Sequence, residues 1–409
     1  MNVPLYNLSP VLAILALGAL LAIAPVLWVL KRRSGSVPGA RLQALTVLTL
    51  FLTMDLVLFG AFTRLTDSGL GCPDWPGCYG EASPLAAHAP ISAAQAALPS
   101  GPVTVSKAWV EMVHRYLATA VGALITLLML ASWRGRKGRA LADTAVRRTA
   151  WDWLPTFTFV WVCVQGAFGA LTVTMKLFPA IVSLHLLGAY LLLALLTLQA
   201  VRGSAAQSAV PASQAALSPP KVRPIRPPSQ TLPTLWIAAA LVLLVLQAAS
   251  GAWVSTNYAV LACSEFPLCQ GQWWPAMDFA RGFELWRPLG ESADGTVLSF
   301  QALTAIHMAH RLLAMLTVVV LALLAWRLRQ SATVQTQARW LGGLVLLQLA
   351  TGLSNVVLGW PMAAAILHTG GAAALVAVLV WLLASPRVTA SAVPSQAWQH
   401  ARGNDPMNA

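Results

Sequence analysis

The sequence predicts an all-α polytopic membrane protein, made of two tandem four-helix bundles related by internal duplication plus one extra N-terminal transmembrane helix. Three observations lead to this prediction: the composition, nine long apolar segments, and motifs that recur at a constant spacing. Of the 409 residues, 57% are apolar and only 10% are charged, whereas about a quarter of the residues in an ordinary soluble domain are charged. The composition therefore excludes a soluble protein.

Nine apolar segments are long enough to cross a hydrocarbon layer of about 30 Å, which takes roughly 20 helical residues. They lie near residues 8–30, 41–63, 107–132, 150–173, 178–201, 233–255, 301–326, 337–359 and 362–384. The first segment does not resemble a secretory signal, because no basic segment precedes it, it is too long, and Lys31, Arg32 and Arg33 follow it. We expect it to be retained, with its N-terminus outside.

The basic residues predict the orientation. Most of the 26 Lys and Arg residues lie in alternate loops on one side, and most of the 13 acids lie on the other. Lys and Arg near span ends mark the cytoplasmic side, so the sequence predicts a bacterial-type cytoplasmic (inner) membrane protein with a cytoplasmic C-terminus. The net charge of +13 then reflects topology, and we expect membrane lipid but no nucleic acid among the partners.

An internal duplication divides the chain. Gly60-Ala-Phe, with Cys72-Pro-Asp-Trp-Pro-Gly-Cys78, matches Gly251-Ala-Trp, with Cys263-Ser-Glu-Phe-Pro-Leu-Cys269, at a constant offset of 191 residues. We expect an extra span (1–40), a first four-helix unit (41–202), a flexible cytoplasmic linker rich in Ala, Ser, Pro and Gln (203–232), a second unit (233–385) and a cytoplasmic tail (386–409). Repeats in the same orientation are related by an axis along the membrane normal.

Four of the seven histidines fit the duplication: His114, His185, His310 and His368. Each lies six to nine residues inside the outer end of its span, which is about 10 Å deep at 1.5 Å per residue. One membrane histidine alone would indicate a hydrogen bond between helices. Two per bundle at matched depth favour axial ligation of a porphyrin iron, and zinc or copper is less favoured because no further ligands accompany each pair.

The residues beside these histidines differ between the halves. Arg115 and Arg311 directly follow a histidine, where they are candidates to bind a porphyrin propionate or to snorkel toward lipid phosphates. Glu111 precedes His114 by one helical turn, whereas His307 occupies the equivalent position in the second half. Glu111 can move protons or can simply favour the start of its helix. We interpret the first half as the catalytic half and the second as the half that holds a fixed electron-transfer cofactor.

Each cysteine pair, Cys72 with Cys78 and Cys263 with Cys269, has five intervening residues and lies in a loop on the oxidising side. This favours an intraloop disulfide over a zinc site, whose cysteines usually have two to four residues between them. A redox role for Cys72 and Cys78 is an alternative to loop clamping.

These motifs resemble those of the heme A synthase family. The resemblance rests on Gly60-Ala-Phe-Thr-Arg-Leu-Thr-Asp-Ser-Gly-Leu-Gly71 with the following cysteine motif, on Glu111-x-x-His114-Arg115, on His307-x-x-His310-Arg311, and on His185 and His368. It covers about residues 41–385. Residues 1–40 and the Ala/Pro-rich outer loop 79–106 are departures from the family pattern.

The resemblance implies oxidation of the C8 methyl group of heme O, through hydroxylated intermediates, to the formyl group of heme A. It implies that His114 and His185 frame the substrate heme, that His310 and His368 ligate a heme b, that Glu111 is essential, and that both cysteine pairs can form disulfides. The expected partners are heme O, delivered by a heme O synthase, and an electron-transfer partner. A homo-oligomer is compatible with the sequence.

Two other functions are compatible with parts of the pattern. A di-heme b cytochrome that passes electrons from quinol to a partner explains the histidines, but it does not explain Glu111 opposite His307. A membrane thiol oxidoreductase uses the outer cysteine pairs but leaves the four depth-matched histidines without a role.

Overall fold

The computed structural model describes residues 8–33, 38–141, 153–208 and 234–385. Within these ranges the chain has nine helices that are long and apolar enough to cross a membrane. They are α1 (Ser9–Arg32), α2 (Pro38–Leu65), α4 (Val105–Leu141), α5 (Leu154–Thr174), α6 (Pro179–Ser208), α7 (Thr234–Thr256), α9 (Phe300–Leu328), α10 (Gln335–Val357) and α11 (Met362–Ala384). The prediction of an all-α multi-pass membrane protein is confirmed.

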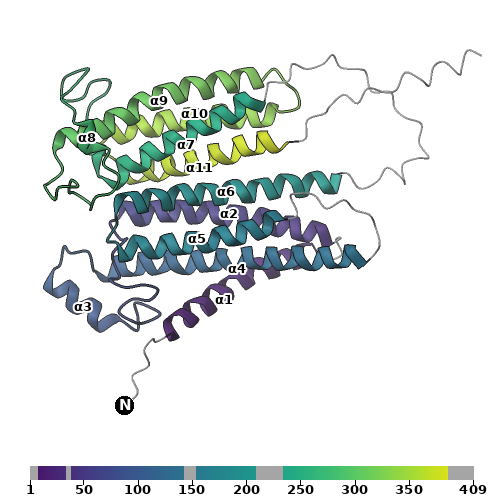
Figure 1. Cartoon of the computed structure of the whole chain (residues 1–409). Helices are drawn as coiled ribbons and strands as arrows, with labels where there is room; N and C mark the ends of the chain where they lie inside the picture. The colour runs from purple at the N-terminus through teal and green to yellow at the C-terminus, as the bar shows by residue number, and fades with distance from the viewer. Residues whose placement is uncertain (1–7, 34–37, 142–152, 209–233, 386–409) are drawn as a thin grey trace, which may run out of the picture.

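The helices form two groups of four, stacked side by side in Figure 1. In the first group α2, α4, α5 and α6 each pack on two neighbours, so that α4 and α6 occupy opposite corners. In the second group α7, α9, α10 and α11 pack in the same cyclic order, with α9 and α11 at opposite corners. This arrangement brings the second and fourth helices of each group to face each other across a bundle core.

The two groups are joined through a shared apolar core. Val57 of α2 and Leu193 of α6 belong to the same buried cluster as Leu324 of α9 and Leu379 of α11. The Tyr190 hydroxyl, which is buried at this interface, donates a hydrogen bond to Thr369 O at 2.8 Å. Burial of large aliphatic side chains contributes roughly 1.5–3 kcal/mol each, so the halves are held together mainly by α2 and α6 against α7 and α11.

A polar contact joins the halves at the end of the bundles that carries the cysteine loops. Arg64 donates to Ser255 O at 2.7 Å, and the Tyr258 hydroxyl donates to Asp67. Residues in each of these pairs are 191 positions apart, which is the repeat offset, so each residue contacts its own counterpart. Burial raises the pKa of Tyr258, which keeps its hydroxyl protonated as the donor to Asp67.

The short elements lie in the loops at one end of the bundles, at the left of Figure 1. They are α3 (His88–Ala97), the 3-10 helix η3 (Ala259–Ala262) and α8 (Phe279–Gly282). Helix α3 belongs to the Ala/Pro-rich loop 79–106, and it packs on α4 through Ile91. Ser299 caps the helix that follows these loops, since its hydroxyl accepts a hydrogen bond from Ala302 N at 3.2 Å.

The extra helix α1 lies against α4 (Figure 1). A Cβ atom at Gly18 would stand 2.6 Å from Thr119 Cβ, so glycine permits the close crossing of the two helices. The opposite face of α1 exposes leucines, which suits contact with lipid acyl chains. Of the predicted linker 203–232, residues 203–208 continue α6. The rest of the linker and the tail 386–409 lie outside the described residues, and the domain boundaries stay predictions.

Candidate functional site

The four histidines selected from the sequence lie on the helices that face each other across each bundle. His114 of α4 and His185 of α6 are close enough to interact electrostatically, and His310 of α9 and His368 of α11 do so in the second half. In both halves these helices stand at opposite corners of their bundle and do not pack on each other. The structure therefore brings the predicted residues together in the predicted pairs.

Each imidazole lies against a glycine of a neighbouring helix. A Cβ atom at Gly60 would stand 3.1 Å from His114 Cε1, and one at Gly251 would stand 3.0 Å from His310 Cε1. Gly352 has the same relation to His368, with 3.1 Å to Cε1. At such distances a larger side chain would displace the ring. These glycines therefore leave room for the imidazole between the helices.

A second repeated contact fixes the backbone near two of the histidines. Gln165 donates to His185 O at 2.9 Å, and Gln348 donates to His368 O at 2.8 Å. In each case the glutamine lies on the preceding helix, 20 residues before the histidine. The same side chain thus holds the fourth helix of each bundle in register with the third.

The histidines of the second half have hydrogen-bond partners on their rings. His310 Nδ1 lies 2.9 Å from the Ser250 hydroxyl, and His368 Nδ1 lies 3.0 Å from the Thr351 hydroxyl. Ser250 donates its proton to Gln247 O at 2.8 Å and Thr351 donates to Leu347 O at 2.7 Å. Each hydroxyl can therefore accept Nδ1–H, which leaves Nε2 unprotonated and able to bind a metal ion.

The side chain of Gln247 also lies beside His310, with its amide nitrogen 3.1 Å from Nδ1. Its amide oxygen is buried without a partner. With the amide oxygen turned toward the ring instead, Gln247 would give Nδ1–H a second acceptor. The Ser250 hydroxyl alone already favours the same tautomer at His310 as the Thr351 hydroxyl does at His368.

The histidines of the first half lack these partners. His114 Nδ1 and His185 Nδ1 are both buried without a hydrogen bond. At the repeat positions of Ser250 and Thr351 the chain has Phe59 and Phe168. The Phe59 ring stacks nearly parallel to the His114 ring, at 6.2 Å between centroids. His114 is therefore packed against an aromatic ring, and neither histidine of the first pair has the hydroxyl partner that each histidine of the second pair has.

Sequence reasoning missed these hydroxyl groups. The signal was available in the duplication, because each Phe-Gly dipeptide of the first half corresponds to a Ser-Gly or Thr-Gly dipeptide of the second. The glycine beside the histidine is kept, and only the residue before it changes from apolar to hydroxylated.

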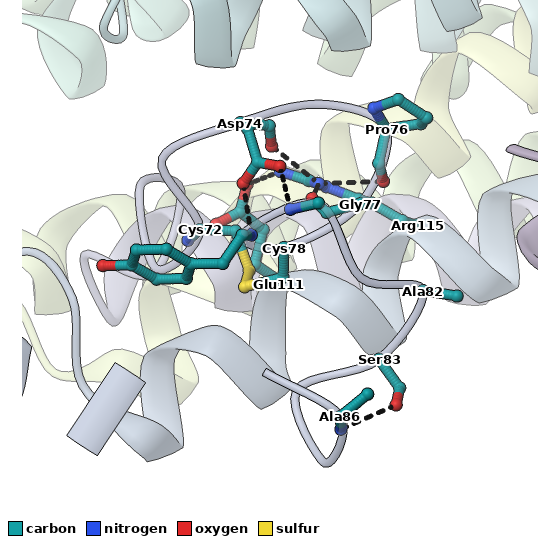
Figure 2. The surroundings of a disulfide bond; sticks show 12 residues. Cys72, Asp74, Pro76, Gly77, Cys78, Ala82, Ser83, Ala86, Glu111 and Arg115 are labelled. Carbon is teal, nitrogen blue, oxygen red and sulfur yellow. Dashed lines mark hydrogen bonds and ion pairs between the residues drawn. A yellow bond between two sulfur atoms is a disulfide. The ribbon is translucent and has the colours of Figure 1, made fainter. Parts of the chain in front are cut away.

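Glu111 joins α4 to the first cysteine loop (Figure 2). Its carboxylate accepts a hydrogen bond from Cys72 N at 2.8 Å and forms an ion pair with Arg115, one helical turn farther along. Only 4% of its surface is exposed. Burial of a carboxylate is costly unless it is paired, and these two contacts provide the pairing.

Arg115 contacts the same loop through its other nitrogen. Its guanidinium donates to the carbonyl oxygens of Asp74 and Pro76, both at 3.0 Å, and to that of Gly77 (Figure 2). The Asp74 side chain in turn accepts hydrogen bonds from the backbone of Tyr79 and Gly80. Arg115 and Glu111 together therefore anchor the first cysteine loop to α4.

The second half has a related arrangement without a carboxylate. His307 Nε2 accepts a hydrogen bond from Arg311 Nε at 3.3 Å, and Arg311 also donates to Leu268 O at 3.1 Å and to Cys263 O at 3.0 Å. Both arginines are thus engaged with the cysteine loops, and their binding of a propionate stays a prediction. The difference between the halves is a carboxylate–guanidinium pair in one and an imidazole–guanidinium contact in the other.

Both cysteine pairs are joined in disulfides, Cys72 to Cys78 and Cys263 to Cys269. All four sulfur-bearing side chains are buried. The peptide bond before the proline of each loop is cis, at Trp75-Pro76 and at Phe266-Pro267. Each half therefore has a closed cysteine loop that is held by a disulfide and by one arginine.

No group of three or more His, Cys, Asp or Glu side chains suited to a metal ion occurs in the described ranges. A porphyrin iron needs only two protein ligands, because the macrocycle supplies four nitrogen atoms. The buried Nδ1 atoms of His114 and His185, and the glycines against all four rings, fit flat ligands held between paired imidazoles.

The comparison with known families agrees with this arrangement. Residues 43–380 match the model of the COX15-CtaA family, described as cytochrome oxidase assembly protein. The chain belongs to this family. The match includes all four paired histidines, Glu111 and both cysteine loops, but it begins after α1.

Curated relatives in the COX15-CtaA family include several bacterial heme A synthases. The enzyme of Shewanella oneidensis is 37% identical over 333 residues, which cover 81% of this chain and 93% of the relative. The heme A synthase of Halalkalibacterium halodurans is 26% identical over 322 residues, 77% of this chain and 87% of the relative. That of Rhizorhabdus wittichii is 26% identical over 367 residues, 84% of this chain and 94% of the relative.

Proposed function

We propose that this protein is a heme A synthase that oxidises the C8 methyl group of heme O to a formyl group. Family membership and the similarity to heme A synthases support the reaction. The different roles assigned to the two halves rest on the difference between their histidine sites: hydroxyl groups contact Nδ1 of His310 and His368, whereas Nδ1 of His114 and His185 is buried without a hydrogen bond.

The second half suits a permanently bound heme b. Ser250 and Thr351 favour the Nδ1–H tautomer of His310 and His368, so that both Nε2 atoms are available as axial ligands. A heme b with two histidine ligands would supply one-electron transfer, and oxidation of a methyl to a formyl group removes four electrons. Imidazoles with a fixed orientation need little rearrangement when the iron changes oxidation state, which suits a heme that relays electrons.

The first half suits a heme that is exchanged. His114 and His185 have no hydrogen bond on Nδ1; the His114 ring stacks on Phe59, and each ring lies against a glycine of a neighbouring helix. Weaker orientation allows the rings to move while heme O enters laterally from the lipid and heme A leaves. Glu111, one turn from His114, is the group of the first half that we assign to proton transfer.

Proton transfer through Glu111 requires its ion pair with Arg115 to open. In the present conformation the carboxylate is engaged by Arg115 and by Cys72 N. A rotation of this side chain toward the histidine would release Arg115 to the loop carbonyl oxygens, which already accept hydrogen bonds from it. The loop therefore stays anchored while the carboxylate changes partner.

The membrane setting follows from the charge distribution. We propose the cytoplasmic membrane of a bacterium, with the cysteine loops and heme sites toward the outer face and the C-terminus in the cytoplasm, as the basic loops indicate. Heme O would come from a heme O synthase in the same membrane. The electron partner is a separate one-electron acceptor reached from the heme b half.

Extraction of the hemes tests the proposed function. The purified protein, expressed in cells that make heme O, is expected to yield heme B together with heme A or hydroxylated heme O on chromatography. Heme B alone would contradict the synthase function and would favour the di-heme b cytochrome. The same chain with Glu111→Gln provides a matched sample for assigning the product peaks.

Removal of the two hydroxyl groups tests the assignment of the heme b half. Ser250→Ala and Thr351→Val should each raise the midpoint potential of the heme b, because an imidazole without an Nδ1–H acceptor donates less charge to the iron. Heme b affinity should fall about 10–100-fold. Potentiometric titration of the low-spin spectrum measures the potential, and heme content after gel filtration measures retention.

Two controls separate orientation of the ring from general packing. Thr351→Ser keeps the hydroxyl and should keep the wild-type potential. Ser354→Ala removes a hydroxyl of the same helix that is bonded only to Ala350 O, and it should have no effect. An unchanged potential in both Ser250→Ala and Thr351→Val would refute the orienting role.

A further inference from the structure

A cavity with a charged rim lies away from the histidines. It has a volume of about 740 Å³ and is open on one side. The end of α1, the first turns of α2 and Ser204 near the end of α6 line it. These helix ends lie on the side opposite to the cysteine loops, where the basic loops are concentrated.

The lining changes from charged to apolar along the cavity. Arg32 and Arg33 lie at one end of the cavity. Val47 and Phe51 lie deeper, one and two helical turns beyond Gln43 on α2. The Trp28 ring forms a wall beside the guanidinium of Arg32, which lies 6.0 Å from the ring centroid. A cavity with a cationic end at the membrane boundary and an apolar end within the span matches an amphiphile with a negative head.

The local charge strengthens this match. Lys31, Arg32, Arg33 and Arg41 lie within 11 residues of one another, and no acidic residue occurs before Asp55. Each Lys or Arg near a membrane surface attracts anionic lipid with about 1 kcal/mol. The phosphate group of a lipid therefore experiences several favourable charges at this end of α1.

The polar floor of the cavity is fixed. Gln43 donates to Ala200 O at 2.6 Å and to the Ser204 hydroxyl at 2.8 Å, so it ties α2 to α6. The large side chains at the rim are not covered: Trp28 is 55% and Phe51 is 64% exposed. The cavity is thus a firm groove between rigid helices with apolar walls that lack a partner in the described part of the chain.

We propose that this groove binds one anionic phospholipid. Its phosphate lies at Arg32 and Arg33, and an acyl chain follows Val47 and Phe51 toward the middle of the membrane. Basic pockets between transmembrane helices on this side of a membrane are suited to such head groups. The lipid would fill the space between α1 and α2, two helices that otherwise share few contacts, and would fasten the extra helix to the bundle.

Part of the groove lies outside the segment that matches the COX15-CtaA family model. The family match begins at residue 43, so Trp28, Arg32 and Arg33 precede it. The inference is also independent of the proposed reaction, because no residue of the groove belongs to the histidine sites.

Native mass spectrometry of the full-length protein in detergent tests the proposal. Titration with phosphatidylglycerol should give one tightly retained lipid, whereas phosphatidylcholine should give none. Arg32→Gln with Arg33→Gln should weaken retention about thirtyfold, as expected for two basic residues. The matched control, Arg327→Gln with Arg329→Gln, removes two exposed basic residues at the end of α9 and should retain the lipid.

A cavity-filling variant separates a groove from general charge attraction. Ala44 lines the cavity, and Ala44→Trp should exclude the lipid while both arginines remain; heme content and gel filtration verify its fold. An excess of inorganic phosphate should not displace the lipid, since phosphate lacks the acyl chain. Equal retention by the wild type and the double arginine variant, full retention by folded Ala44→Trp, or a heme in place of the lipid would overturn the proposal.

Discussion

Replacing His310 with alanine is expected to abolish the low-spin heme b spectrum while the protein still accumulates in the membrane. His310 faces His368 across the second bundle, and its ring is oriented by Ser250. Loss of one of two axial ligands leaves the iron five-coordinate or releases the heme. A reduced-minus-oxidised difference spectrum, together with heme content per protein, measures the loss.

Three control measurements show whether the loss is specific to this heme ligand. His88→Ala removes an exposed histidine of α3 and should leave the spectrum unchanged. His114→Ala should retain the low-spin heme b and should affect only the substrate heme. Added imidazole should restore much of the spectrum in His310→Ala, because Gly251 and Ser250 leave the space of the lost ring intact. An unchanged spectrum in His310→Ala would show that the ligands are assigned to the wrong pairs.

The spans were predictable because the membrane demands a fixed length of apolar helix. The ends of the helices were less predictable. The thickness of the hydrocarbon layer sets the length of the apolar segment, but it does not determine how far a helix continues into water. Helix α4 continues to Leu141, beyond the predicted end near residue 132, through a segment rich in Arg and Lys. These residues favour helix, and their charges keep the extension outside the apolar layer.

The outer loops were predictable only through their cysteines. The pairing in each loop follows from short spacing on the oxidising side, but α3 was not predicted. Its sequence is Ala-rich, and Ile91 is the buried residue of the helix, so no apolar periodicity marks it. The contacts of Arg115 and Arg311 with the cysteine loops were equally hidden, because the acceptors in these loops are backbone carbonyl oxygens, which have no signature in the sequence.

The histidines could be identified from the sequence because the two halves of the chain can be compared with each other. Matched depth and matched spacing in two halves separate a paired site from an isolated polar residue. The same comparison predicted the importance of Glu111 opposite His307, but the roles of Ser250 and Thr351 needed the ring orientations. A hydroxyl group in a membrane helix usually bonds its own backbone, and both do so here while also facing a histidine nitrogen.

Glu111→Gln should retain both the protein and its heme b but stop formyl formation. The amide keeps the size of the side chain and an oxygen acceptor for Cys72 N, but it loses the negative charge that pairs with Arg115 and the capacity to take up a proton. Proton transfer by a positioned side chain contributes about 10²–10⁴-fold to a rate. We therefore expect heme A formation to fall by at least about 100-fold, with heme O as the extracted species beside heme B.

The control for Glu111→Gln must separate chemistry from anchoring of the loop. Tyr116→Phe removes a hydrogen bond to Ala82 O of 2.7 Å, so it loosens the same loop but leaves the carboxylate in place, and it should retain most of the activity. Thiol labelling should find Cys72 and Cys78 still oxidised in both variants. An equal loss of activity in Tyr116→Phe would assign the effect to the loop, and full activity of Glu111→Gln would remove this carboxylate from the mechanism.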